Sequence, residues 1–127
     1  MKCILIADDS ALIRQGLRRM FEVRGWRVCA EAANGREAIT HAQEFKPDIV
    51  VLDLAMPVMN GLDAGLAIKE LLPTAHLILF TSHGHILGQE QVASFGFSAL
   101  VSKNAGESIV AKAQSLLDTA SRGSEMS

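Results

Sequence analysis

The sequence predicts an α/β fold in which helices cover both faces of a five-stranded parallel sheet. Five short apolar runs alternate along the chain with longer segments whose apolar residues recur at helical spacing. The runs Ile49–Leu52 and Leu77–Phe80 are apolar at every position, which is typical of strands buried on both faces. Such alternation indicates a doubly wound sheet whose parallel strands are joined by right-handed crossovers.

Three strands and two helices are expected in the first half of the chain. In order, they are a strand over 3–7, a helix over 11–23, a strand over 27–33, a helix from 34 to the proline at 47, and a strand over 49–52. Gly25 ends the first helix, and Pro47 closes the second because proline cannot continue a helix. Asn34 followed by Glu37 forms an N-cap pattern, which favours a helix start there over the hairpin turn that Asn34-Gly35 would also allow.

Three helices and two strands are expected in the second half. In order, they are a helix over 62–72, a strand over 77–80, a weakly marked helix at about 87–95, a strand over 99–101, and a last helix continuing through 109–117. Pro73 and Gly96 end the first two of these helices. Asn104 with Glu107 repeats the N-cap pattern and predicts the start of the last helix. The small polar residues from Ser121 onward are expected to fray.

Composition restricts the class of function. A length of 127 residues suits one domain, expected over 1–119, with 120–127 as a flexible tail or the start of a linker. Twelve basic and fourteen acidic residues leave no excess positive charge for a phosphate backbone, so nucleic-acid binding by this chain alone is not expected. Because no apolar run suits a signal peptide or a membrane span, we expect a cytoplasmic protein without membrane contact.

The two cysteines, Cys3 and Cys29, lie inside short apolar runs. We interpret them as small buried hydrophobic residues, since the chain has no C-x-x-C spacing. A disulfide or a shared metal is the alternative.

Polar groups follow four of the five apolar runs. They are Asp8 and Asp9, Asp53, Thr81 and Ser82, and Ser102 and Lys103. Ligands bind outside the carboxyl ends of the strands in open α/β sheets, so these groups are expected to converge. Singly, each could cap a helix or face solvent. Together, three carboxylates repel one another unless a cation lies between them.

Oxygen ligands and a small site favour Mg²⁺ as that cation. Mg²⁺ and Lys103 would balance three carboxylates and leave the site able to accept more negative charge, which a phosphoryl group provides. Carboxylates attack phosphorus to give acyl phosphates, and the transition state needs charge stabilisation on its oxygens. Asp53 is the best candidate for the nucleophile because it ends the most apolar central run. Asp8 and Asp9 would lie on the metal side.

These residues together resemble the receiver domain of bacterial two-component response regulators. The resemblance covers the chain from Cys3 to about Leu117. It is carried by Asp8-Asp9, Asp53 with Met56-Pro57-Val58-Met59-Asn60-Gly61, Thr81 and Lys103. It implies a flavodoxin-like sheet with strand order 2-1-3-4-5. The run from Ile6 to Ser10 and the run Arg14-Gln15-Gly16-Leu17 are further similar to receivers attached to LuxR-type helix-turn-helix output domains.

The resemblance implies a metal site and a phosphoryl acceptor. Asp53 would accept the phosphoryl group from a phosphohistidine on a sensor kinase. Asp9, Asp53 and the backbone carbonyl of Ala55 would contact Mg²⁺ directly, and Asp8 would act through water.

The same resemblance assigns the remaining groups and the partners. Thr81 would hydrogen-bond the phosphoryl group and Lys103 would pair with its oxygens. The partners would be a sensor histidine kinase or a phosphotransfer protein, with a homodimer as a further option. Such a protein catalyses only its own phosphorylation and dephosphorylation, so we do not expect an enzyme.

Two positions depart from the common family pattern, and two more occupy places that affect how long the phosphoryl group persists. Leu100 stands where an aromatic residue usually couples phosphorylation to the signalling face, so the segment 81–95 would have to move instead. Asn104 replaces a frequent cis proline, and a trans bond is expected because a non-proline cis bond costs about 2.5–4 kcal/mol. Ala55 and His83 occupy positions that tune phosphate lifetime in the family.

Two other functions compete with this hypothesis. A degenerate receiver would act as a protein-interaction module without phosphorylation. A phosphatase or phosphotransferase of the aspartyl-phosphate type would need a D-x-D motif, whose second carboxylate is absent from Asp53-Leu54-Ala55. A transition-metal site at His83 and His85 is disfavoured because no second ligand cluster accompanies it.

Overall fold

A five-stranded parallel sheet forms the centre of the molecule. The computed structural model describes residues 3–82 and 88–126. Its elements are β1 (Cys3–Ala7), α1 (Ala11–Val23), β2 (Arg27–Ala32), α2 (Gly35–Phe45), β3 (Ile49–Leu52), α3 (Gly61–Leu71), β4 (His76–Thr81), α4 (Gln89–Ala93), β5 (Ala99–Ser102), the 3₁₀ helix η1 (Lys103–Ser108) and α5 (Ile109–Met126). The strand order β2-β1-β3-β4-β5 confirms the predicted doubly wound, flavodoxin-like sheet.

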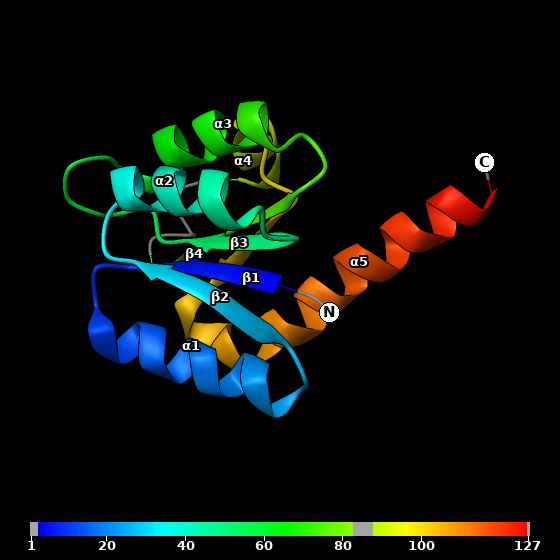
Figure 1. Ribbon diagram of the computed structural model, residues 1–127, viewed down its shortest axis with the longest axis horizontal. Coiled ribbons are helices and arrows are strands. Elements are labelled where there is room, and N and C mark those ends of the chain that lie inside the picture. The colour runs from blue at the N-terminus through cyan, green and yellow to red at the C-terminus, as the bar shows by residue number, and fades with distance from the viewer. Residues whose placement is uncertain (1–2, 83–87, 127) are drawn as a thin grey trace.

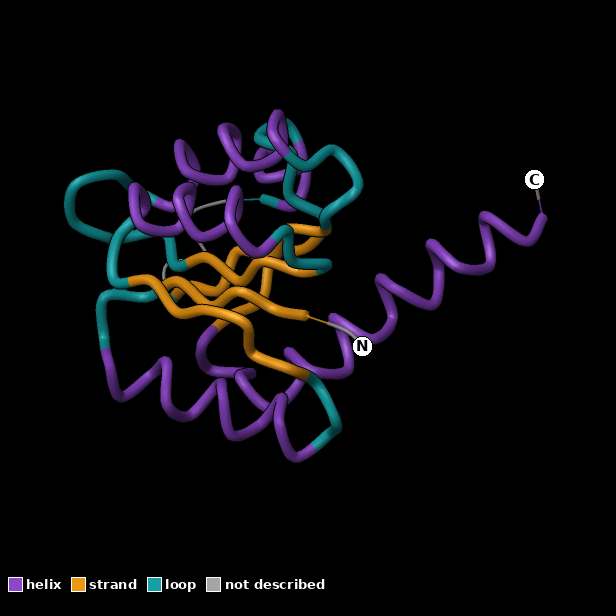
Figure 2. Tube along the Cα trace, in the orientation of Figure 1, coloured by secondary structure: helices purple, strands orange, loops and turns teal. Residues whose placement is uncertain are grey.

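Helices pack on both faces of the sheet, so the molecule has three layers. Helices α1 and α5 lie on one face, and α2, α3 and α4 lie on the other (Figures 1 and 2). Alternate strand residues point to opposite faces and form two separate cores. Phe21 and Ile109 belong to the core beneath α1 and α5, whereas Ala38 and Ile68 belong to the core beneath α2, α3 and α4. Across the described residues, no helix has both the length and the apolar composition needed to cross a bilayer.

The register of the central strands aligns their carboxyl ends. Ala7 of β1 pairs with Leu52 of β3, and Leu52 pairs with Leu79 of β4. Thr81 at the end of β4 pairs with Ser102 at the end of β5. The residues that follow these strands therefore meet at one edge of the sheet, as predicted.

The first three long helices begin at side-chain caps. The hydroxyl of Ser10 accepts a hydrogen bond from the backbone N–H of Ile13, which begins α1 at the predicted residue. Asn34 caps α2 by accepting from the N–H of Glu37, which confirms the predicted cap. Asn60 caps α3 in the same way. These caps satisfy N–H groups that have no partner inside the helix.

The start of the last helix differs from the prediction. The cap is Ser102, whose hydroxyl accepts from the N–H of Asn104, and a 3₁₀ segment follows. Ala105 has non-helical dihedral angles there, so the α-helix begins at Ile109 rather than at Asn104. The short hydroxyl of Ser102 captures the first free N–H and tightens the turn, which moves the cap two residues upstream. As expected, the described residues contain no cis peptide bond.

Two helix lengths also differ from the expectations. Helix α5 continues to Met126 and extends away from the sheet (Figure 1), whereas the apolar pattern ended near Leu117. The domain boundary at 119 remains a prediction. Helix α4 covers Gln89–Ala93 only. The expected start of that helix at Leu87, together with His83 and His85, lies outside the described residues.

The interpretation of the cysteines as buried and unpaired is wrong. Cys3 and Cys29 form a disulfide between β1 and β2, and both residues are only half-buried. The register shifts between Ile4 and Leu5, which leaves Cys29 as the extra residue of a bulge in the edge strand. This bulge brings Cys29 beside Cys3, with a Cα–Cα distance of 5.7 Å that suits a disulfide. Sequence spacing could not show the bulge, because it depends on how the strands pair.

We predict that reduction of this disulfide destabilises the fold. The bridged residues are 26 apart in sequence, and closing a loop of that length stabilises a protein by about 3.5 kcal/mol in the chain-entropy model. Urea unfolding with and without a reductant measures the loss. The double variant Cys3→Ser/Cys29→Ser is the control, and its unfolding should not respond to reductant. Two alkylated cysteines in native, unreduced protein would contradict the prediction.

Candidate functional site

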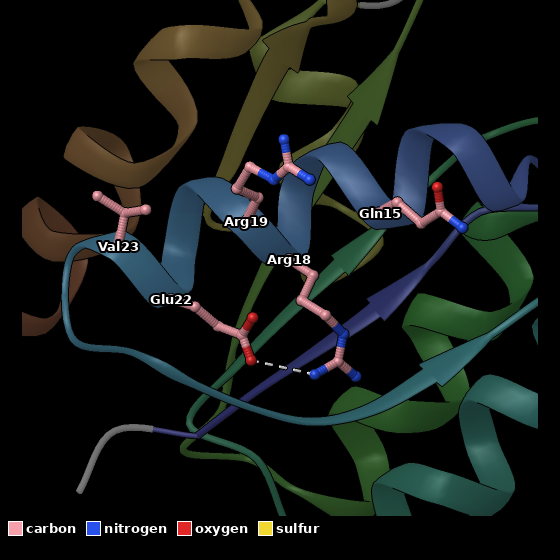
Figure 3. A pocket seen from close by; sticks show the side chains of 5 residues that line it. All are labelled: Gln15, Arg18, Arg19, Glu22 and Val23. Atoms are coloured by element: carbon pink, nitrogen blue, oxygen red, sulfur yellow. Dashed lines mark hydrogen bonds and ion pairs between the residues drawn. The ribbon is translucent and has the colours of Figure 1, made fainter.

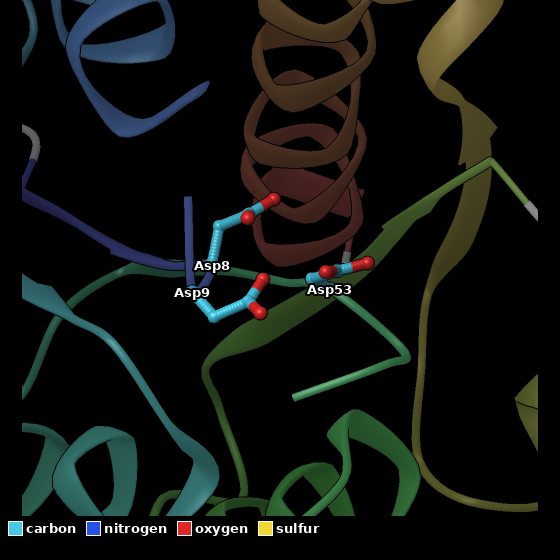
Figure 4. A group of neighbouring side chains, drawn as sticks. All are labelled: Asp8, Asp9 and Asp53. Carbon is cyan, nitrogen blue, oxygen red and sulfur yellow. The ribbon is translucent and has the colours of Figure 1, made fainter. Parts of the chain in front are cut away.

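Three carboxylates gather at the carboxyl edge of the sheet. Asp8 and Asp9 follow β1, and Asp53 follows β3, so the pairing of these two strands brings the three side chains together (Figure 4). One oxygen from each lies within 4.8 Å of the others. Asp8 and Asp53 are 1% and 5% exposed, whereas Asp9 is exposed. This oxygen-rich donor set fits a hard divalent cation such as Mg²⁺.

Among the described residues, Lys103 forms ion pairs with this cluster. It follows β5, and its Nζ lies 2.9 Å from Oδ2 of Asp8 and 3.4 Å from Oδ2 of Asp53. The lysine side chain is 21% exposed, so the ion pairs are partly shielded from water. One ammonium group cannot neutralise three carboxylates, and the cluster keeps a net negative charge.

Backbone hydrogen bonds hold the two acidic segments against each other. The N–H of Asp53 donates to the carbonyl of Ala7 at 2.9 Å, which extends the pairing of β1 and β3 beyond the last strand residue. The N–H of Asp8 donates to the carbonyl of Ala32 at 3.0 Å. The N–H of Ser10 donates to Oδ1 of Asp8 at 2.9 Å, so this carboxylate also shapes the turn into α1.

The environment of Asp53 favours its protonated form. Burial, followed by the charge of Asp8 and the smaller influence of Asp9, raises the pKa of Asp53 above its ordinary value. Lys103 acts in the opposite direction and only reduces the shift. Burial lowers the pKa of Lys103, but its hydrogen bond to Asp8 and the charge of Asp53 outweigh that effect and raise it. Lys103 is therefore charged at neutral pH.

The structure places the other predicted site residues at or near the same edge. Thr81 is the last residue of β4 and is fully buried. Ala55 lies exposed in the loop between β3 and α3. Leu100 lies in β5 and is half-buried, and its carbonyl accepts a hydrogen bond from the side chain of Gln89 in α4 at 3.4 Å.

Gly61 lets the loop after β3 fold back onto Asp53. Its N–H donates to the carbonyl of Leu54 at 2.9 Å. A Cβ atom at this position would overlap the backbone carbonyl oxygen of Asp53. The close approach of α3 to the acidic residue therefore requires glycine.

Sequence reasoning missed two charged residues beside the site. Arg14 of α1 donates from Nη1 to the backbone carbonyl of Asp8 at 2.6 Å and from Nε to Glu31 of β2 at 3.0 Å. The sequence carried no signal for this contact, because it depends on how α1 packs along the edge strand.

The fold and the site define a doubly wound α/β domain whose acidic side chains gather around a buried aspartate and a lysine. A family model described as the response regulator receiver domain matches residues 4–114. The chain belongs to this receiver domain family. Receiver domains bind Mg²⁺ at an acidic pocket and interact with kinases or phosphotransfer proteins.

Two curated relatives show what this chain is similar to. It is 43% identical over 83 residues to a chemotaxis protein CheY from Thermotoga maritima, covering 65% of this chain and 69% of that protein. It is 39% identical over 107 residues to a protein-glutamate methylesterase/protein-glutamine glutaminase from Hahella chejuensis, covering 83% of this chain but 31% of that protein. The chain therefore spans less than a third of the methylesterase.

Solved structures show the same architecture. A LuxR-family two-component response regulator from Aurantimonas sp. SI85-9A1 is 33% identical with a TM-score of 0.80, covering 91% of this chain and 83% of that chain. A CheX-CheY-BeF3-Mg complex from Borrelia burgdorferi is 25% identical with a TM-score of 0.82, covering 91% of this chain and 88% of that chain.

We predict that Asp53→Asn makes the domain more stable at pH 7 when no divalent cation is present. The folded state raises the pKa of Asp53, so it binds the proton more tightly than the unfolded chain, whose value is about 3.9. The carboxylate therefore costs folding free energy above its raised pKa, and this cost disappears as the pH falls toward the unfolded value. Urea unfolding of both proteins in EDTA between pH 4 and pH 7 should show the difference narrowing on acidification. A wild-type domain at least as stable as the variant at pH 7 would contradict this.

We further predict that Gly61→Ala destabilises the domain by about 2 kcal/mol, since overpacking typically costs about 1–3 kcal/mol. The added methyl group must push α3 away from the backbone of Asp53. Gly16→Ala is the matched control, because no atom lies within 4 Å of its Cβ position and α1 is helical there. That control should gain roughly 0.5–1 kcal/mol from helix propensity. Equal effects of the two substitutions on urea unfolding would refute the steric role of Gly61.

Proposed function

We propose that this chain is a phosphorylation-controlled signalling domain in which Asp53 accepts a phosphoryl group from a phosphohistidine. The donor would be a sensor histidine kinase or a phosphotransfer protein. The observation that carries the proposal is the position of Asp53, a buried carboxylate 3.4 Å from the ammonium of Lys103 and next to two further carboxylates. Membership of the receiver family supports it.

The proposed transfer of the phosphoryl group from phosphohistidine to Asp53 needs no further reactant. A carboxylate oxygen of Asp53 forms a bond to phosphorus while the P–N bond of the phosphohistidine breaks. The electron pair of that bond remains on the imidazole nitrogen, and the ring leaves neutral when its other nitrogen carries a proton. The attacking group is the ionised carboxylate of Asp53.

We further propose that Asp8, Asp9, Asp53 and the backbone carbonyl of Ala55 form the Mg²⁺ site. Asp9, Asp53 and the carbonyl of Ala55 would contact the ion directly, and Asp8 would act through water. One oxygen from each of the three carboxylates lies within 4.8 Å of the others, which suits a small, hard cation. When bound, Mg²⁺ supplies positive charge that stabilises the oxygens of the transferred phosphoryl group.

Lys103 and Thr81 would bind the phosphoryl oxygens. Lys103 would exchange part of its ion pairing with Asp8 and Asp53 for the phosphoryl oxygens. Thr81 ends the strand next to β3, and its hydroxyl would donate a hydrogen bond to the phosphoryl group. Lys103 would supply positive charge and Thr81 a hydrogen-bond donor to the phosphoryl group. We propose that the domain catalyses only its own phosphorylation and dephosphorylation.

The output is proposed to be a change in protein contacts. The face formed by α4, β5 and α5 would bind a partner or a second copy of the chain, and Leu100 in β5 leaves no aromatic ring there to rotate. Similarity to a LuxR-family regulator favours a transcriptional output if a DNA-binding domain follows in the full-length protein. Because the net charge of the chain is −2, we do not propose nucleic-acid binding by this chain alone.

A cytoplasmic location follows from the proposed partner. A reducing cytoplasm would open the Cys3–Cys29 disulfide seen in the structure. Cys3 begins β1 and Asp8 follows the end of that strand, so reduction would act on stability and leave the acidic edge in place.

The second candidate is a degenerate receiver that binds its partner without phosphorylation. The position of Leu100 favours this reading because the usual aromatic switch is missing. The assembled carboxylates and Lys103 favour the phosphorylated module, because the carboxylates repel one another unless a cation is bound between them.

We predict that the domain takes up one phosphoryl group from acetyl phosphate in the presence of Mg²⁺. Intact-mass measurement would detect it, and EDTA should abolish it. Asp53→Asn should show no uptake, whereas Asp118→Asn, which removes an exposed carboxylate of α5, should react like the wild type. No uptake by folded wild-type protein from acetyl phosphate or from a cognate kinase would leave the degenerate receiver as the function.

A further inference from the structure

One arginine connects the first helix to the peptide bond between the two adjacent aspartates. Nη1 of Arg14 donates to the carbonyl oxygen of Asp8 at 2.6 Å, and Nε donates to Oε1 of Glu31 at 3.0 Å. The Arg14 side chain is only 18% exposed, so both contacts are partly shielded from water. Charge-assisted hydrogen bonds of this kind are about twice as strong as neutral ones.

The carbonyl that Arg14 binds lies at a sensitive position. It belongs to the planar peptide unit that joins Asp8 to Asp9, so fixing this oxygen fixes the plane from which both side chains project. β1 ends at Ala7, and the Asp8 carbonyl thus lies beyond the strand and takes its hydrogen bond from a side chain. Figure 4 shows the carboxylates of Asp8 and Asp9 leaving this short segment toward Asp53.

Glu31 orients the guanidinium from the neighbouring strand. Its partner in the sheet is Ile6 of β1, so it is held close to the acidic turn. Its second oxygen accepts from Nε of Arg18 at 2.7 Å. Each carboxylate oxygen therefore binds one arginine, which leaves Nη1 of Arg14 aimed at Asp8.

Arg18 provides a natural comparison on the same helix. It binds Glu31 and also Glu22 at 3.2 Å, and it lines an open pocket on the outer surface of α1 with Gln15, Arg19 and Val23 (Figure 3). Neither of these ion pairs is to a residue of the acidic cluster. Arg14 and Arg18 thus share a charge, a helix and the partner Glu31, but Arg14 contacts the carbonyl of Asp8 whereas Arg18 contacts Glu22.

We propose that Arg14 is a positioning residue that holds the Asp8–Asp9 peptide in the orientation that binds Mg²⁺. This inference rests on the proposed function of the same site, and it adds a residue that acts through the backbone and touches neither the metal nor the phosphoryl group. If Arg14 positions the peptide, removing it should weaken Mg²⁺ binding. If its charge alone mattered, removing it should strengthen Mg²⁺ binding, because a positive charge near the cluster repels the cation. The sign of the change on removing Arg14 therefore separates positioning from charge.

The test compares Mg²⁺ affinity in three variants of the whole chain, measured by titration of the backbone amide NMR shifts of Asp8 and Asp9. Arg14→Gln should weaken Mg²⁺ binding roughly tenfold, in the range found when residues that orient metal ligands are removed. Arg18→Gln should stay within about twofold of the wild type, since it loses the same charge and the same partner. Arg14→Lys keeps the charge but replaces the planar guanidinium, whose Nε and Nη1 hold two acceptors in a fixed geometry, with a single ammonium group, and should also weaken binding.

Equal affinity in the Arg14 and Arg18 variants, or tighter binding by Arg14→Gln, would overturn the inference while leaving the proposed function intact. Wild-type protein that binds no Mg²⁺ would overturn both. Arg14→Lys also decides the matter if Arg14→Gln fails to fold. Phosphorylation by acetyl phosphate gives a second readout, because no protein docks in that reaction. The Arg14 variants should need about tenfold more Mg²⁺ for half-maximal rate and reach a similar rate at saturation.

Discussion

Two buried carboxylates at one edge of one sheet set the constraint on which the rest of the site depends. Asp8 and Asp53 are almost fully inaccessible to water, and Asp9 adds a third negative charge within the same cluster. Burial and mutual repulsion raise the pKa of Asp53, and Lys103 offsets only part of this cost. The excess negative charge favours binding of a cation such as Mg²⁺, and the bound cation together with Lys103 would then favour binding of a phosphoryl group. This order of charges is the chemical basis of the proposed function.

The sheet supplies the rigidity that holds these charges together. Strand residues such as Val50, Ile78 and Leu79 are completely buried between two helical layers, and burying such side chains stabilises a protein by roughly 1.5–3 kcal/mol each. The register of β1 with β3 then forces Asp8 and Asp53 to adjacent positions. Stability is thus gained in the two cores, and it offsets the repulsion that is concentrated at one edge.

Short contacts around the edge refine the arrangement that the sheet produces. Gly61 allows α3 to approach the backbone of Asp53, and Arg14 binds the carbonyl of Asp8 from α1. The turn after β5 follows the same principle. Ser102 captures a backbone N–H immediately after the strand, so Lys103 begins a tight 3₁₀ segment that keeps its ammonium over the cluster.

The sequence by itself determined the alternation of strands and helices and the polar groups at the strand ends, because burial periodicity and capping are local properties. Helix α1, strand β3 and the cap at Asn34 agree with their patterns for this reason. Only the tertiary structure decided that Cys29 lies at a bulge beside Cys3 and that Arg14 reaches Asp8. These features depend on strand register and helix packing, which join residues distant in the chain and leave no periodic trace in it.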